Sequence, residues 1–327
     1  MPRFFLPSRL PVDPYVLALL GTVALASVLP ATGLAADAVG TTATWAVALL
    51  FFLYGARTSP REAVDGLRHW RLHSTVLLTT FGLFPLLGIA ALTLPSSVLS
   101  AELGTGLLFL CLLPSTVQSA ITFTSIARGN VVAAVCSGTF SNLLGIVLTP
   151  VLAGLLIGTN GGFSAGSLAD IALLLLAPFA AGQALRRWIG GWTTRNKQVL
   201  GLVDRGAILL VVYSAFGRSV VDGVWHQLTP ARLAVLLALE AVLLAVVLTV
   251  TASASRRLGF PREDRITIVF CGSKKSLASG LPMATVLFTG PSAGLIMLPL
   301  MLFHQMQLLV CAVLARRWAA QAQPVQG

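Results

Sequence analysis

The chain has 327 residues, of which 56% are hydrophobic and only 10% charged, and its mean hydropathy is +0.87. Soluble domains usually carry about a quarter charged residues, so most of the surface of this chain cannot face water. The composition indicates a polytopic membrane protein and excludes a soluble enzyme, a secreted disulfide scaffold and a disordered chain. The four cysteines lie in apolar runs without metal-ligand spacing, so neither a metal site nor a disulfide is predicted.

Ten apolar segments follow one another along the chain, separated by loops too short to hold an aqueous domain. Ten membrane helices of about 20 residues each would use about 200 residues. The first segment follows Arg3 and Arg9 and could alternatively be a signal peptide, although it is just long enough to span a membrane. The predicted fold class is an all-α polytopic membrane protein with ten transmembrane helices, over Tyr15–Leu29, Thr42–Ala56, Ser74–Leu94, Gly104–Ile126, Val131–Ile157, Leu168–Trp188, Leu202–Val220, Leu233–Ala254, Ile266–Phe288 and Ser292–Leu314.

The basic residues give the chain a net charge of +11, but they lie in small clusters between the apolar segments. On a ten-span topology, 18 of the 22 lysines and arginines fall in loops on the side of both termini. Only Arg218 and Arg232 fall on the opposite side, and Lys274 and Lys275 lie within a segment. This asymmetry predicts an integral protein of the cell (inner) membrane with both termini cytoplasmic. It argues against a nucleic-acid partner, which would need a basic stripe.

The fourth segment contains a proline and a run of polar residues where lipid-facing residues would be expected. Pro114 removes a backbone hydrogen-bond donor in mid-span, and nearby hydroxyl and amide side chains can replace it. Polar groups inside a span cost free energy unless they are satisfied, so we expect a functional break here. A single serine could instead serve close helix packing. The candidate solute- or ion-binding side chains of this segment are Ser115, Thr116, Gln118, Ser119 and Thr122.

The ninth segment holds two adjacent lysines, with Gly272 and Pro282 on either side. Lys274 and Lys275 would lie about 100° apart on a helix, so an intact lipid-facing helix could not hide both. A break lined by protein or water could accommodate the pair. The remaining candidate binding residues come from this break and from the segments that follow each interrupted one, and they are Ser273, Lys274, Lys275, Ser276, Asn142 and Gln305.

The two interrupted segments are the fourth and the ninth, five apart in a set of ten. An odd number of spans in each half makes the halves run in opposite directions, which is typical of transporters built from inverted repeats. We therefore predict two inverted five-helix repeats, residues 1–160 and 161–327, whose discontinuous fourth and ninth helices cross near the membrane midplane. The ends of the half-helices would present free N–H and C=O groups there.

One acidic residue, Glu240, lies deep within a span and is a candidate charge partner for the lysines. It lies eight residues beyond Arg232, which is about 12 Å from one side of the membrane at 1.5 Å per residue. Lys274 lies about 12 Å from the other side, so in a core about 30 Å thick their depths differ by only about 6 Å. An ion pair of Glu240 with Lys274 or Lys275 follows as a hypothesis, because depth says nothing about lateral position.

Six short segments carry distinctive polar motifs: Trp70–His73, Pro114–Ser119, Phe123–Ala127, Phe140–Gly145, Gly272–Gly280 and His304–Leu308. In this order they resemble the bile acid:sodium symporter-like branch of the bile acid/sodium symporter superfamily. The resemblance covers nearly the whole chain. It implies ten helices in two inverted repeats of five. It also implies a core bundle from spans three to five and eight to ten, which moves against a panel from spans one, two, six and seven.

The sequence departs from the sodium-coupled members of that superfamily near the break in the ninth helix. Those members place a carboxylate and a glutamine there as sodium ligands, whereas this chain has Phe270 and Lys274 at about those positions. We therefore predict no obligatory cofactor, sodium included. The ammonium of Lys274, helped by Lys275, is predicted to take the place of the ion and to permit proton coupling or exchange. The alternative is that both lysines stay charged and brace the crossover.

The function predicted is secondary active transport of a small organic solute, an organic anion, by alternating access and without strict sodium dependence. Lysines, helix ends and hydroxyl groups suit an anionic solute. The alternatives are a sodium-coupled bile-acid-type symporter, a channel or regulatory scaffold, and an intramembrane enzyme. The chain has neither the Gly-x-x-x-x-Gly-Lys-Ser/Thr loop of nucleotide-driven transport nor a His-Glu-x-x-His metalloprotease motif. Its expected partners are the solute and the lipid bilayer.

Overall fold

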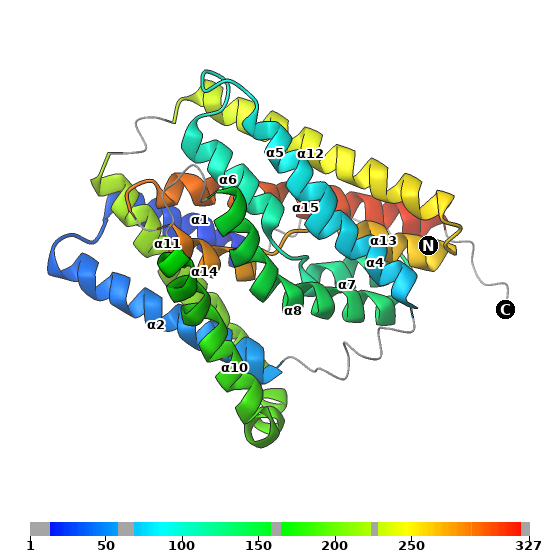
Figure 1. Ribbon diagram of the computed structural model, residues 1–327, viewed down its shortest axis with the longest axis horizontal. Coiled ribbons are helices and arrows are strands. Elements are labelled where there is room, and N and C mark those ends of the chain that lie inside the picture. Colours follow the sequence, from blue (N-terminus) through cyan, green and yellow to red (C-terminus); the bar gives the residue numbers. More distant parts are fainter. Residues whose placement is uncertain (1–13, 58–68, 158–164, 224–227, 289, 322–327) are drawn as a thin grey trace, which may run out of the picture.

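The computed structural model describes residues 14–57, 69–157, 165–223, 228–288 and 290–321, and every regular element within these ranges is a helix (Figure 1). Arg3 and Arg9, which bear on the signal-peptide alternative, lie outside the described residues. In chain order the helices are α1 (Pro14–Val28), α2 (Leu34–Arg57), α4 (Trp70–Leu78), the π-helical turn η2 (Thr79–Leu83), α5 (Phe84–Leu92), α6 (Ala101–Leu112), α7 (Val117–Ile126), α8 (Val131–Leu156), α10 (Ala165–Arg195), α11 (Lys197–Val221), α12 (Pro230–Arg257), α13 (Arg262–Ser273), α14 (Leu277–Leu287) and α15 (Ala293–Gln321).

Each predicted apolar segment overlaps one helix, a continuous run of helical elements, or a pair of helices separated by a short break. The third segment is α4, η2 and α5 in continuous succession, the fourth is α6 and α7, and the ninth is α13 and α14. By length and composition, six helices within the described residues can cross a membrane: α2, α4 to α5, α8, α11, α12 and α15. The α6–α7 pair, bent by 64° at its break, makes a seventh.

Several helices are longer than the apolar runs that predicted them. Helix α2 begins at Leu34 rather than at Thr42, because Asp37 interrupts the apolar pattern without breaking the helix. An acidic residue in the first turn is favourable, since the N-terminal end of a helix carries partial positive charge. Helix α10 likewise continues to Arg195, past the predicted end at Trp188.

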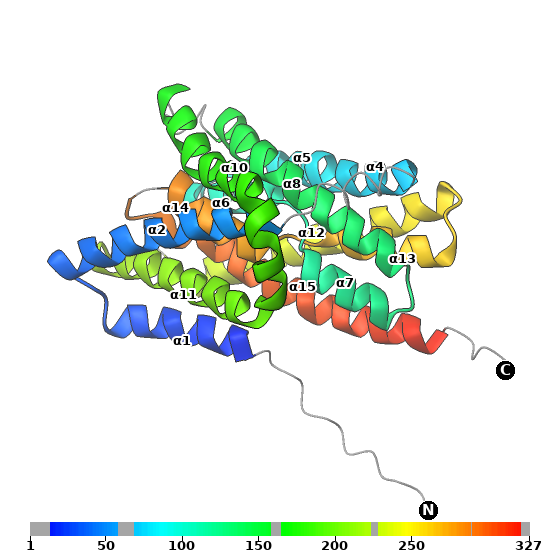
Figure 2. The same cartoon turned by 90° about the horizontal axis from the view of Figure 1, so that it is seen from below.

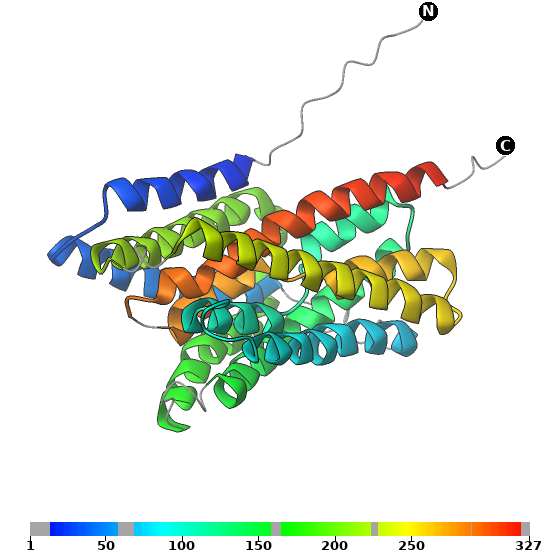
Figure 3. The same cartoon turned by 90° about the horizontal axis from the view of Figure 1, so that it is seen from above.

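The helices pack in two groups, with α1, α2 and α11 toward one end of the molecule and α4, α7 and α13 toward the other (Figures 1 and 2). In the first group α2 packs on α10 and α11, and α1 packs on α11. In the second group α6 packs on α5 and α15, α7 on α8, and α12 on α13 and α15. The two groups meet where α10 contacts α8, and where α11 contacts α14 and α15. Figure 3 shows α12 beside the red α15.

Two glycines, Gly55 and Gly182, explain the tight packing of α2 on α10. A Cβ at Gly55 would collide with the backbone carbonyl of Phe179, and one at Gly182 would collide with that of Phe52. The two helix backbones can therefore approach closely only because neither position has a side chain. Such small residues are favoured at helix contacts within membranes, where close van der Waals packing replaces the hydrophobic driving force.

Candidate functional site

Two helices of the second group are interrupted by short extended segments. The first break separates α6, which ends at Leu112, from α7, which begins at Val117, and it contains Pro114. The second break separates α13 from α14, and its first residue, Lys274, has φ −98° and ψ 147°. Ser276 ends this break and caps α14, because its hydroxyl accepts a hydrogen bond from the Ser279 amide at 3.3 Å.

Hydrogen bonds link the first break directly to the second break and to the end of α13. The Ser276 amide donates to the carbonyl of Pro114 at 2.9 Å. The hydroxyl of Thr116 donates to the Lys275 carbonyl at 2.7 Å. The hydroxyl of Ser115 donates to the carbonyl of Cys271, which lies on the last turn of α13, at 2.5 Å. The backbone polar groups exposed by each break are thus satisfied partly by the other break, as a lipid-surrounded backbone requires.

The fully buried side chain of Lys275 forms the centre of this contact. Its ammonium donates three hydrogen bonds to backbone carbonyl oxygens, those of Thr80 (2.9 Å), Cys111 (2.8 Å) and Leu113 (2.7 Å). The nitrogen also lies 4.1 Å from the centroid of the Phe84 ring, which provides a cation–π contact. An ammonium has three donors, so these carbonyls use its full capacity. A cation at the C-terminal end of α6 is also favoured by the helix dipole.

These carbonyls are free because of local features of the sequence. The last carbonyls of α6 have no helical partner, since the helix ends at Leu112 and the Ser115 amide donates instead to the hydroxyl of Ser141 at 3.0 Å. Thr80 lies in the π-helical turn η2, in which an amide donates to the carbonyl five residues earlier. The residue five positions after Thr80 is Pro85, which has no N–H.

Helix α8 supports the first break with a row of polar side chains. The amide nitrogen of Asn142 donates to the Ser115 carbonyl at 2.9 Å. The hydroxyl of Thr149, two turns further along α8, donates to the Leu112 carbonyl at 2.8 Å. A Cβ at Gly145 would lie 2.6 Å from the Cβ of Pro114, so this position needs a glycine for the break to fit. The polar residues of α8 therefore satisfy the carbonyls that Lys275 does not reach.

The second break is supported by Gln307 of α15, a buried residue that was not among the predicted site residues. Its side-chain oxygen accepts from the Lys275 amide and its nitrogen donates to the Lys275 carbonyl, both at 2.9 Å. The predicted residue Gln305 is only half-buried and lies on another side of α15. Helical spacing distinguishes the two glutamines. Gln307 lies four residues after Phe303 and four before Cys311, which are both fully buried, so it shares their face of α15.

Lys274 makes different contacts from Lys275, although it is equally buried. Its ammonium lies 4.3 Å from the centroid of the Phe123 ring of α7. Among the described residues it has no oxygen or nitrogen as a hydrogen-bond partner, and the Cys311 thiol is its polar neighbour. The free carbonyls are thus held by Lys275 and not by Lys274, while the prediction that Lys274 takes the place of a coupling ion stays a prediction.

The ion pair suggested for Glu240 is not present in the structure. Glu240 is fully buried on α12, and within the described residues neither of its carboxylate oxygens has a hydrogen-bond partner. The ammonium of Lys275 is already saturated by carbonyls, and that of Lys274 lies on the Phe123 ring. Similar depth in the membrane was the only basis for the pairing, and the lateral positions do not support it.

The remaining predicted residues do not join the contact between the breaks. Gln118 and Thr122 are exposed on α7, where the Thr122 hydroxyl donates to the Gln118 carbonyl at 2.9 Å. The hydroxyls of Ser119 and Ser273 are buried, and neither has a partner among the described residues. The site that the structure assembles thus combines Ser115, Thr116, Asn142, Lys275 and Ser276 with the unpredicted Ser141, Thr149 and Gln307.

A polar cavity of about 440 Å³ lies between the two helix groups, where α2 and α11 face the end of α14 and the start of α15. The guanidinium of Arg218 crosses Gly40, at which a Cβ would collide with it. Among the described residues Arg218 forms no ion pair. The polar side chains that line the cavity are Asp37, Thr41, Thr44, Ser214, Arg218 and Thr285.

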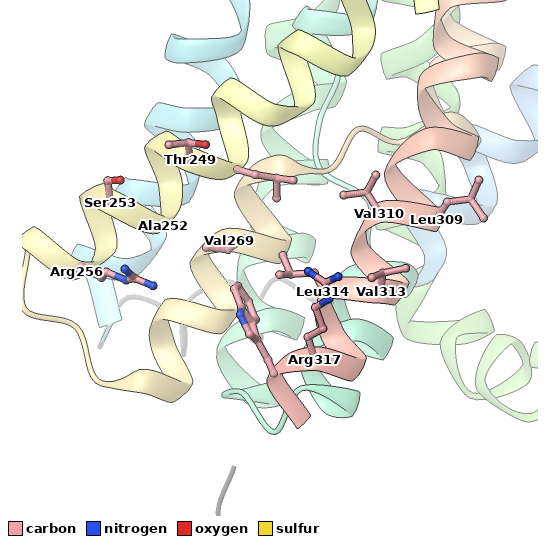
Figure 4. A pocket seen from close by; sticks show the side chains of 12 residues that line it. Thr249, Ala252, Ser253, Arg256, Val269, Leu309, Val310, Val313, Leu314 and Arg317 are labelled. Carbon is pink, nitrogen blue, oxygen red and sulfur yellow. The ribbon is translucent and has the colours of Figure 1, made fainter. Parts of the chain in front are cut away.

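A second, larger groove of about 640 Å³ lies between α12, α13 and α15 (Figure 4). Its lining is mostly apolar, with Arg256 and Arg317 at one end. Neither hollow offers a metal site, since no group of three or more His, Cys, Asp or Glu side chains suited to a metal occurs among the described residues.

Comparisons with known proteins place the chain among membrane transporters. Residues 13–320 match the model of the SBF-like CPA transporter family. The chain is 53% identical to an uncharacterised protein of Pseudomonas aeruginosa over 96% of this chain and 94% of that protein. It is 48% identical to the putative symporter YfeH of Escherichia coli, over 96% and 95% of the two chains. It is 31% identical to sodium/bile acid cotransporter 7 of Mus musculus, over 85% and 84%. The chain therefore belongs to the SBF-like CPA transporter family, whose relatives include proteins named as symporters.

Proposed function

We propose that this chain is a secondary active transporter that moves a small organic anion across the cell (inner) membrane by alternating access. In this proposal ten helices form two inverted repeats, residues 1–160 and 161–327, and both termini are cytoplasmic. The observation that carries the proposal is the direct contact between the breaks of the fourth and ninth segments, with the ammonium of Lys275 on three free carbonyls. Discontinuous helices that meet in this way are typical of transport sites built from inverted repeats.

The moving parts in this proposal are the two helix groups. The group of α1, α2, α10 and α11 corresponds to the panel, and the group of α4 to α8 with α12 to α15 corresponds to the core. The polar cavity beside Arg218 supports a solute path between them, because helices of both groups line it. The start of α15, at Ala293, also lines this cavity, and the partial positive charge of a helix N-terminus favours an anion.

The coupling proposed does not require sodium. A bound ion at a helix break neutralises free carbonyls, and the ammonium of Lys275 already does so here. The names of the mammalian and amphibian relatives favour a second candidate, a sodium-coupled bile-acid-type symporter. Among the described residues no carboxylate oxygen hydrogen-bonds to Lys275, and the three carbonyl oxygens that could coordinate a sodium ion are already occupied by its ammonium.

The test is uptake into proteoliposomes that contain the purified full-length protein. Pools of carboxylates, sulfates, neutral solutes and cations are offered under a sodium gradient, a pH gradient or neither. We expect saturable uptake and counterflow of an organic anion that persist when choline replaces sodium. Uptake that requires sodium and ignores pH would favour the sodium-coupled candidate. Flux that neither saturates nor shows counterflow would favour a channel, and chemical conversion of a solute without flux would favour an enzyme.

A further inference from the structure

The groove between α12, α13 and α15 differs from the cavity between the helix groups in both position and lining. Every residue that lines it comes from these three helices, so none belongs to α1, α2, α10 or α11. Its walls carry exposed apolar side chains, among them Leu309 (63% exposed) and Val313 (54% exposed). Such side chains on the outer surface of a membrane protein face lipid, and the groove therefore opens toward the bilayer rather than toward a solute path.

Two arginines mark one end of the groove. Figure 4 shows Arg256 of α12 and Arg317 of α15 extending into it from opposite walls. Within the described residues the only ion pair is the one between Arg57 and Asp204, so neither arginine of the groove has a carboxylate partner. The end of α15 is tied to α13 by Arg262, whose guanidinium donates to the Trp318 carbonyl at 2.7 Å. This hydrogen bond holds the backbone next to Arg317 against α13.

The length of the groove matches one leaflet of a bilayer. On α12 the lining extends from Arg256 to Leu248, and on α15 it extends from Arg317 to Leu309. Each is a distance of eight residues, which is about 12 Å along a helix. Half of a hydrocarbon core about 30 Å thick is about 15 Å, so the lining of about 12 Å extends over most of the depth of one leaflet. The arginines then lie at the level of the headgroups.

We propose that this groove binds a phospholipid with an anionic headgroup. The headgroup phosphate accepts hydrogen bonds from Arg256 and Arg317, and one acyl chain lies along the apolar walls between α12 and α15. Guanidinium groups suit this role because they bind phosphate through paired hydrogen bonds and stay charged. Basic pockets between membrane helices are known to select anionic lipids. The bound lipid would hold the ends of α12 and α15 at a fixed separation.

The test is native mass spectrometry of the full-length protein, with phosphatidylglycerol and phosphatidylcholine of identical acyl chains as probes. We expect phosphatidylglycerol to bind more tightly. Arg256→Gln and Arg317→Gln should each weaken its binding about fivefold, and the double variant about 25-fold. The matched controls are Arg257→Gln and Arg316→Gln, which remove the same charges from exposed neighbours outside the groove and should change binding less than about twofold.

A second pair of variants tests the apolar part of the groove. Ala252→Trp and Val310→Trp fill it from opposite walls without changing charge, and each should weaken the binding of phosphatidylglycerol. Glycerol phosphate, which has no acyl chain, should not compete. The proposal is overturned if the two phospholipids bind equally, if the control arginine variants lose as much binding as the groove variants, or if glycerol phosphate displaces the lipid.

Discussion

The ammonium of Lys275 donates a 2.7 Å hydrogen bond to the carbonyl of Leu113, which lies 162 positions earlier in the chain. This contact joins the second helix break to the first, because Leu113 is the first residue after the end of α6. The same ammonium also binds Thr80 in the π-helical turn of the third segment. One side chain of the ninth segment therefore connects the third and fourth segments, at a point where these two would otherwise expose unpaired carbonyls.

Removal of this ammonium should destabilise the protein. Lys275→Ala leaves three buried carbonyls without a donor, and each unsatisfied buried group costs about 1–3 kcal/mol. We expect a loss of about 3 kcal/mol or more in the free energy of unfolding, measured by thermal unfolding in detergent. Lys274→Ala is the matched control, since Lys274 has no oxygen or nitrogen partner among the described residues, and it should cost less. Equal losses in the two variants would contradict the assignment of the carbonyl contacts to Lys275.

The two glutamines of α15 should respond differently to the same substitution. Gln307→Leu removes both hydrogen bonds to the backbone of Lys275, which should cost about 2–3 kcal/mol. Gln305→Leu, at a half-buried position, should change stability by less than about 1 kcal/mol. The two stability changes are measured as shifts in the unfolding midpoints of the purified variants. A larger loss for Gln305→Leu than for Gln307→Leu would refute the role given to Gln307.

Glu240 should behave as a buried carboxyl group without a partner. Glu240→Gln keeps its size and removes the negative charge, so it should leave the protein as stable as before or more stable. Its unfolding midpoint is measured beside that of wild type. If Glu240 pairs with Lys274 or Lys275, Glu240→Gln would clearly lower the unfolding midpoint. A double variant that also replaces the paired lysine would then lose less stability than the sum of the losses in the two single variants.

A methyl group at Gly145 should disturb the first break. The added Cβ of Gly145→Ala would lie 2.6 Å from the Cβ of Pro114, so α8 or the break must shift, at a cost of about 1–3 kcal/mol. Gly206→Ala is the control, because nothing lies within 4 Å of a Cβ at that position. The comparison uses thermal unfolding and, once a solute is identified, the maximal transport rate. A neutral Gly145→Ala would show that α8 does not hold the break in place.

The arginine of the cavity between the helix groups should determine solute affinity. Arg218→Gln removes the cation that faces Thr41 and Ser214, and it should raise the KM for an anionic solute about tenfold, since hydrogen bonds to charged groups contribute about 1.5–3 kcal/mol. Asp37→Asn should lower the KM, because it removes a negative charge from the same cavity. Arg232→Gln, outside the cavity lining, is the control. An unchanged KM in Arg218→Gln would exclude this cavity from the path of the anion.

Local sequence signals were sufficient to locate both helix breaks. Pro114 removes a donor, and two adjacent lysines cannot both be hidden on an intact apolar helix, so each interruption could be predicted without the structure. The different roles of Lys274 and Lys275 could not be predicted from the sequence. Lys274 has extended backbone angles, and adjacent side chains of an extended segment point in opposite directions. One ammonium therefore reaches Phe123 and the other reaches Phe84, a choice that depends on tertiary packing.

The contact of Lys275 with Thr80 in the third segment could not be predicted from the sequence either. Thr80 offers its carbonyl only because η2 has π-helical hydrogen bonding and because Pro85 occupies the position of the missing donor. A proline near the middle of an apolar segment is visible in the sequence, but the π-helical turn depends on the packing around it. Glu240 shows a similar limit, since its sequence position predicted a depth but could not predict which side chains would lie beside it.

The sodium dependence of thermal unfolding, compared between wild type and Lys275→Ala, tests most directly whether the ammonium of Lys275 stands in the place of a coupling ion. In choline chloride and in sodium chloride of equal ionic strength, wild type should unfold at the same temperature to within about 1 °C, because its carbonyls are already occupied. Lys275→Ala frees the three carbonyls, and sodium should raise its midpoint by about 2 °C or more. A wild-type protein that sodium stabilises, with a variant that sodium leaves unchanged, would contradict the proposal.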